Sequence, residues 1–143
     1  MCKLRNKKTL VIAFILGILA FFAIQAIMGL LRDNETVFEP AIHSISSSEA
    51  REKINEHQDA FILDVRTHEE FYQRRIPGAV NIHYTEIAAL QALLPQDNNA
   101  MILVYCQTGR RAGIAAFELA ELGYTNIFVF PGMIDWEGET VTS

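Results

Sequence analysis

A cysteine stands where an apolar segment ends and a basic loop begins. The apolar residues 101–105 stop at Cys106, and the five residues that follow include one glycine and two arginines. An alanine-rich segment with helical spacing comes next. A thiol at the N-terminus of a helix and beside guanidinium groups is favoured in its thiolate form. The pattern therefore predicts that Cys106 is a nucleophile for an anionic, sulfur-containing substrate.

The loop after Cys106 carries side chains suited to binding an oxyanion. Arg110 and Arg111 present forked donors that match the oxygens of such an anion. Gly109 allows the backbone to turn tightly, and Thr108 offers a hydroxyl to the sulfur or to a leaving group. A simpler interpretation stays open at this point, in which Cys106 is a small buried side chain and one of the arginines is solvated.

Apolar strands alternate with helical segments over most of the chain. Strands that are apolar throughout are typical of a mostly parallel sheet covered by helices on both faces, so the sequence predicts an α/β fold. Turns are expected at the two Pro-Gly pairs, 77–78 and 131–132. We expect an extended segment at 42–45, strands at 61–65, 79–82, 101–105 and 126–130, and helices at 46–57, 67–72, 85–94, 112–122 and 133–136.

The N-terminal region is typical of a membrane anchor. Residues 9–31 contain no charged side chain, and as a helix they would extend roughly 34 Å, enough to cross a hydrocarbon core of about 30 Å. Four basic residues precede them, which predicts that residues 1–8 are cytoplasmic and that the rest lies on the outer, periplasmic side. Residues 32–40 would form a linker and residues 41–143 one domain. A cleaved signal peptide is the alternative, although its apolar region usually has only about 7–15 residues.

Charge and composition exclude several other classes of function. Residues 9–143 hold eight basic and 17 acidic side chains, so we expect no nucleic-acid partner. The four histidines show no metal-ligand spacing, and we expect neither a metal nor a cofactor. Cys2 and Cys106 form no CxxC pair and would lie on opposite sides of the membrane, so no disulfide is expected.

Four motifs together resemble one protein family. They are LDVRTHEEF at 63–71, IPGAVNI at 76–82, VYCQTGRRA at 104–112 and PGMIDW at 131–136. In this order they resemble the rhodanese (thiosulfate sulfurtransferase) domain, in particular its small membrane-tethered or periplasmic single-domain members. The resemblance implies an open five-stranded parallel sheet with helices on both faces. It also implies a cysteine persulfide that takes sulfane sulfur from a donor such as thiosulfate and passes it to cyanide or a thiol.

The resemblance also implies roles for particular residues. The backbone N–H groups of the loop would surround the Cys106 sulfur. Independently of the resemblance, we expect Asp64 and Arg66 to form a structural ion pair or to support the loop and not to act in catalysis. Arg75 stands where the family often has a histidine, which leaves the hydrogen bonds of that turn open. The residues expected to bind the sulfur donor are Gln107, Thr108, Gly109, Arg110 and Arg111.

Two other functions compete with sulfur transfer. A cysteine phosphatase or arsenate reductase needs an arginine six residues after its cysteine, but Ala112 occupies that position here. The loop is therefore one residue too short for that chemistry. A non-catalytic, tethered module for sulfur sensing or protein interaction is the second alternative. Cys106 and its complete basic loop argue against it, because inactive relatives typically lack the cysteine.

Overall fold

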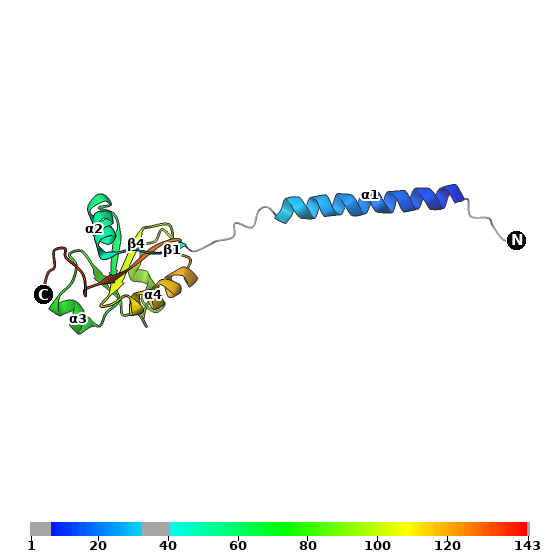
Figure 1. The fold of residues 1–143 in the computed structure, drawn as a ribbon. Helices are drawn as coiled ribbons and strands as arrows, with labels where there is room; N and C mark the ends of the chain where they lie inside the picture. The colour runs from blue at the N-terminus through cyan, green and yellow to red at the C-terminus, as the bar shows by residue number, and fades with distance from the viewer. Residues whose placement is uncertain (1–6, 33–40, 143) are drawn as a thin grey trace. The chain divides into compact units, whose positions relative to one another are not determined.

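The chain divides into two compact units, Met1–Val37 and Phe38–Ser143. The computed structural model describes residues 7–32 and 41–142. The first unit contains the helix α1, Lys7–Arg32 (Figure 1). Within residues 7–32 and 41–142, no helix is both long enough and apolar enough to cross a membrane. The membrane helix predicted at 9–31 is therefore unconfirmed, and the predicted segments 1–8 and 32–40 lie almost wholly outside the described residues.

The second unit is built on a five-stranded sheet in which every neighbouring pair of strands is parallel. The strand order is β1-β5-β4-β2-β3. The α/β fold and its five-stranded parallel sheet are as predicted. The strands are β1 (Ala41–Ser44), β2 (Phe61–Asp64), β3 (Val80–Asn81), β4 (Ile102–Cys106) and β5 (Asn126–Gly132).

Helices cover both faces of this sheet, as predicted. The helices of the second unit are α2 (Ser47–Glu56), α3 (His68–Gln73), α4 (Arg110–Glu121) and the short 3₁₀ helix η1 (Gln91–Leu93). Successive strand residues point to opposite faces. On β4, Val104 and Cys106 join the core beneath α4, whereas Leu103 and Tyr105 join the core beneath α2. Figure 1 shows α2 and α4 on opposite sides of the sheet.

Capping boxes begin two of the helices. Ser46 caps α2, where its hydroxyl accepts the Glu49 N–H at 3.2 Å and its own N–H donates to the Glu49 carboxylate at 2.8 Å. Thr67 and Glu70 form the same reciprocal pair at the start of α3. Such pairs satisfy backbone donors that have no partner within the helix. Both helix starts agree with the sequence prediction.

The helix predicted at 85–94 is wrong. That segment is a series of turns followed by η1. The apolar side chains that suggested one helical face do not share an environment, since Ile87 and Leu94 are buried whereas Leu90 and Leu93 are 38% and 54% exposed. Helical spacing of apolar residues was therefore not sufficient to predict a helix here, because only Ile87 and Leu94 are buried in the core.

The predicted turn at 131–132 and the helix predicted at 133–136 also differ from the structure. Strand β5 continues through Gly132, which pairs with Cys106 after a shift in register. Beyond it, the N–H groups of Met133 and Ile134 donate to the carbonyls of Cys106 and Gln107, both at 3.1 Å. These bonds tie the segment after β5 to the cysteine loop.

Gly132 allows β5 to approach the cysteine loop closely. Its φ is +90°, a left-handed conformation that side chains disfavour. A Cβ built there would collide with the carbonyl oxygen of Cys106 and would lie 2.9 Å from Cδ2 of Tyr105. Only glycine therefore fits between the end of β5 and the end of β4.

We predict that Gly132→Ala destabilises the domain by more than about 2 kcal/mol, because strain and backbone displacement add together. Gly113→Ala is the control. Gly113 lies inside α4 with nothing within 4 Å of a built Cβ, so alanine should stabilise the helix by up to about 1 kcal/mol. Urea unfolding of both variants measures the difference. Equal free energies of unfolding for the two variants would contradict the proposed close approach.

Candidate active site

Cys106 lies at the carboxyl end of β4, between β2 and β5 in the sheet. It is a free cysteine and is 1% exposed. Its Sγ accepts the backbone N–H of Gly109 at 3.1 Å. Gly109 has a φ of +90°, a conformation that favours glycine. The tight turn after β4 therefore aims a backbone donor at the sulfur.

Helix α4 begins directly after this turn. Gly109 is its N-cap and Arg110 its first residue, two residues before the predicted start at Ala112. The buried face of α4 is made mainly of small side chains, which let the helix lie close to the sheet. Its N-terminal end, the positive end of the helix dipole, thus meets the cysteine loop. The buried residues of α4 are Ala112, Ala115, Ala116 and Leu119.

Arg111 is paired with a carboxylate on α3. Its Nη1 and Nη2 donate to the two oxygens of Glu70 at 2.6 and 2.8 Å. These hydrogen bonds, helped by those from Thr67, lower the pKa of Glu70 from 4.5 to about 2. They also raise the pKa of Arg111, as does the nearby Cys106. One loop arginine is therefore partly neutralised by Glu70 and held beside the sulfur.

Asp64 and Arg66 form a buried ion pair at the carboxyl end of β2. Their side chains are 0% and 4% exposed, and Nη2 of Arg66 lies 2.7 Å from Oδ2 of Asp64. Two further N–H groups of Arg66, the backbone N–H and Nε, also donate to Asp64. The Nη2 of Arg66 reaches the carbonyl of Arg74 as well, so the pair joins the end of β2 to the chain that follows α3. The sequence analysis predicted a structural ion pair or loop support here, and the structure shows the ion pair.

A hollow of about 560 Å³ borders the cysteine loop through Gln107. Among the predicted donor-binding residues, Gln107 lines this hollow, whereas Thr108 and Arg110 are exposed on the loop. Arg74 and Ile134 also line it, and neither was among the predicted site residues. The full lining is Arg66, Glu70, Gln73, Arg74, Gln107, Met133 and Ile134.

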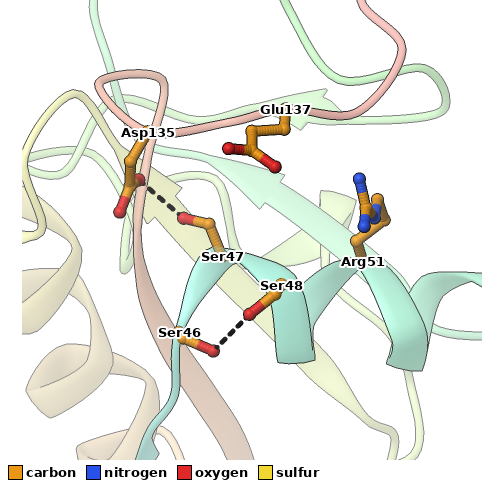
Figure 2. A pocket seen from close by; sticks show the side chains of 6 residues that line it. All are labelled: Ser46, Ser47, Ser48, Arg51, Asp135 and Glu137. Atoms are coloured by element: carbon orange, nitrogen blue, oxygen red, sulfur yellow. Dashed lines mark hydrogen bonds between the residues drawn. The ribbon is translucent and has the colours of Figure 1, made fainter.

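A second hollow, of about 240 Å³, lies at the start of α2 and contains none of the predicted site residues (Figure 2). Ser47 there donates its hydroxyl to Oδ1 of Asp135 at 2.7 Å. This bond ties the N-terminus of α2 to the segment after β5. The hollow is lined by Ser46, Ser47, Ser48, Arg51, Asp135 and Glu137.

Metal binding finds no support in the described part of the chain. No group of three or more histidine, cysteine, aspartate or glutamate side chains within residues 7–32 and 41–142 could hold a metal ion. The ring nitrogens that are bonded, in His68 and His83, contact the side chains of Asn81 and Thr85 at 2.8 Å.

Fold and site together define an α/β domain with a buried thiol on a basic loop at the carboxyl edge of a parallel sheet. Residues 46–138 match the family described as the rhodanese-like domain, and the chain belongs to this family. The resemblance carried by the four sequence motifs is thereby confirmed.

Two relatives and one solved structure illustrate the similarity. Thiosulfate sulfurtransferase PspE of Escherichia coli is 37% identical over 73 residues, covering 51% of this chain and 70% of that protein. The sulfurtransferase-named protein YtwF of Bacillus subtilis is 33% identical over 99 residues, covering 69% of this chain and 94% of that protein. A rhodanese-related protein from Thermoplasma volcanium is 26% identical with a TM-score of 0.61, covering 71% of this chain and 99% of that one.

The match to a longer relative is partial. YrkF of Bacillus subtilis, named as a sulfur carrier protein, is 35% identical over 101 residues, which are 70% of this chain. The match covers 54% of YrkF, so this chain spans about half of that protein. Together these similarities support sulfur transfer as the general class of reaction.

We predict that Glu70→Gln removes part of the acid sensitivity of the fold. Glu70 has a pKa of about 2 in the folded chain and 4.5 ordinarily, so its stabilising contribution is complete above pH 4.5 and is lost as the pH falls towards 2. The stability difference between wild type and Glu70→Gln should therefore shrink over that window. Urea unfolding at a series of pH values, at low salt, measures it.

The control for this measurement is Glu69→Gln, which removes the neighbouring charge from the same helix. Glu69 accepts one long hydrogen bond, 3.5 Å, from Gln73. The difference in unfolding free energy between wild type and Glu69→Gln should not shrink over this pH window as it does for Glu70→Gln. A Glu70→Gln difference that stayed constant from pH 6 to pH 2 would show that the Arg111 pair does not stabilise the folded chain.

Proposed function

We propose that this protein is a sulfurtransferase that carries sulfane sulfur as a persulfide on Cys106. The observation that carries the proposal is the hydrogen bond from the Gly109 N–H to Sγ of Cys106, 3.1 Å long, at the N-terminus of α4. A backbone donor and a helix dipole aimed at one sulfur favour its anionic form. The thiolate, and not the thiol, is the nucleophile in sulfur transfer. We take thiosulfate as the donor, supported by the name of the relative PspE.

The reaction has two displacement steps. In the first, the Cys106 thiolate attacks the outer sulfur of thiosulfate, the sulfur–sulfur bond of thiosulfate breaks, and sulfite leaves with the bonding electron pair. In the second, a thiolate or cyanide attacks the outer sulfur of the Cys106 persulfide, and Cys106 leaves as a thiolate. No net oxidation occurs across the cycle, so the reaction needs no cofactor. The Gly109 N–H stabilises the Cys106 thiolate that attacks in the first step and that leaves in the second.

The two loop arginines take different roles in this proposal. Arg110 is exposed and belongs to neither ion pair found among the described side chains, so its guanidinium is available to the oxygens of the donor. Arg111 is held by Glu70 and orders the loop beside the sulfur. Gln107 and Thr108 supply polar contacts at the entrance.

The competing functions fit the site less well. A phosphate-sized loop needs an arginine six residues after the cysteine, whereas α4 here begins at Arg110, four residues after Cys106. Turnover of an aryl phosphate or of arsenate without sulfur transfer would favour the phosphatase or reductase alternative. A tethered sulfur-sensing module would have no need for a sulfur nucleophile with a dedicated backbone donor. Failure of Cys106 to take up sulfur would favour that alternative.

We predict that Cys106→Ser lowers thiosulfate:cyanide sulfur transfer by about 10³-fold or more, since a serine hydroxyl is not an equivalent nucleophile. Cys2→Ser is the matched control and should retain full activity. Mass spectrometry of the full-length chain after thiosulfate treatment should find one added sulfur atom on Cys106 in wild type and in Cys2→Ser. Wild-type activity in Cys106→Ser would exclude the nucleophile assignment.

We also propose, from the amino-acid sequence alone, that residues 9–31 anchor the chain in a membrane with the rhodanese domain on the outer side. The segment is uncharged and four basic residues precede it, a pattern that leaves the N-terminus in the cytoplasm. The full-length chain should then stay in the membrane fraction after an alkaline carbonate wash, and protease added to spheroplasts should digest the domain.

The double variant Ile18→Lys, Phe21→Lys is the control for the anchor. Each lysine near the centre of a spanning helix costs about 2.5–3.5 kcal/mol, so the variant should move to the soluble fraction. Release of the unaltered chain by carbonate would contradict the anchor, and protection from protease would contradict its orientation.

A further inference from the structure

The hollow beside the cysteine loop holds one cation that is not paired with an acid. Of the arginines near the hollow, Arg66 is paired with Asp64 and Arg111 with Glu70. Arg74 also lines the hollow, and no carboxylate among the described residues lies within ion-pair distance of it. A guanidinium has five N–H donors, and the side chain of Arg74 uses one, from Nη2 to the carbonyl of Met133 at 2.9 Å.

Arg74 is nevertheless held in place. Its backbone N–H donates to the carbonyl of Glu70 at 3.2 Å, and its own carbonyl accepts Nη2 of the buried Arg66. The bond to Met133 fixes the far end of the side chain. A charged group that is already ordered loses less entropy on binding a ligand than a free surface arginine does.

The hollow suits an organic molecule better than a small inorganic anion. Its volume of about 560 Å³ falls within the range of about 300–1,000 Å³ seen for sites that bind organic ligands. Ile134 gives it an apolar wall that is 64% exposed, while Gln73 and Gln107 give it polar ones. The N–H of Ile134 is bound to the carbonyl of Gln107, so this wall is attached to the cysteine loop itself.

We propose that Arg74 binds the carboxylate of an organic thiol, which is the sulfur acceptor, and so selects anionic thiols over neutral ones. This inference rests on the proposed function. Cys106 itself is 1% exposed, but the outer sulfur of its persulfide extends about 2 Å further. The acceptor thiolate attacks that outer sulfur, a new sulfur–sulfur bond forms, the bond to Cys106 breaks, and Cys106 leaves as a thiolate. The carbon skeleton of the acceptor meanwhile lies against Ile134.

Single-turnover transfer from the loaded enzyme tests this role. The full-length chain in detergent is treated with thiosulfate, freed of excess donor and checked by mass spectrometry for one added sulfur on Cys106. Rapid-quench measurements then give the rate of transfer to mercaptopropionate, which is anionic, and to mercaptopropanol, which has nearly the same size and is neutral. The variants compared are Arg74→Gln, Arg74→Lys and Arg51→Gln.

We expect Arg74→Gln to slow transfer to mercaptopropionate about fivefold, the effect of losing one partly exposed charge-assisted contact. Transfer to mercaptopropanol and loading from thiosulfate should stay within about twofold of wild type. Arg74→Lys should recover part of the loss because it keeps the charge. Arg51→Gln makes the same charge change in the hollow at the start of α2 and should change neither rate, which controls for long-range steering.

Each other outcome has a defined meaning. Equal slowing with both thiols would overturn the inference in favour of a purely structural role, and unchanged rates with both would overturn it outright. Slower loading from thiosulfate with normal transfer to both thiols would show that Arg74 binds the donor, and this result would also overturn the inference. If Cys106 in the wild-type chain takes up no sulfur, the proposed function fails and the inference fails with it. Normal loading with an unchanged thiol preference refutes the inference alone.

Discussion

The parallel pairing of β2, β4 and β5 is the constraint on which the site depends. Because these strands run in the same direction, their carboxyl ends meet at one edge of the sheet. Asp64, which pairs with Arg66, ends β2, Cys106 ends β4, and Gly132 ends β5. Residues far apart in the chain are thereby brought together around the cysteine loop at this edge of the sheet. The close approach at Gly132 and the backbone bonds from Met133 and Ile134 then hold that loop from behind.

Ion pairing within the protein determines which arginines near this edge are available to bind a ligand. Arg66 is buried and needs Asp64, because an unpaired buried charge is costly. Arg111 shares Glu70 with the capping box of α3, so one carboxylate both starts a helix and orients a loop side chain. Arg110 and Arg74 belong to no ion pair among the described side chains. Arg110 lies on the loop and Arg74 lines the neighbouring hollow, and this separation is the basis of our proposal that donor and acceptor are bound by different arginines.

Local sequence patterns predicted much of the fold. The two wrong helix predictions have the same cause, which is a conformation that depends on distant residues. The starts of α2 and α3 were predictable because a capping box is a contact between residues three apart. The strands were predictable from their apolar runs. The helices predicted at 85–94 and 133–136 are absent from the structure, because the conformation of both segments depends on residues far away in the chain. Ile87 and Leu94 pack into the core while Leu90 and Leu93 do not. The segment after β5 is bound to the cysteine loop through the N–H groups of Met133 and Ile134.

The sequence by itself determined the family, the parallel α/β fold and the place of Cys106 at the end of a strand before a glycine turn and a helix. These depend on residue type and short spacing, which act locally. Only the tertiary structure decided that Glu70 pairs with Arg111 and that Gly132 lies against the Cys106 carbonyl. It also decided that Arg74 lines the hollow and forms no ion pair with any described carboxylate. Each of these joins elements separated in the chain, and packing of the strands and helices is what brings them into contact.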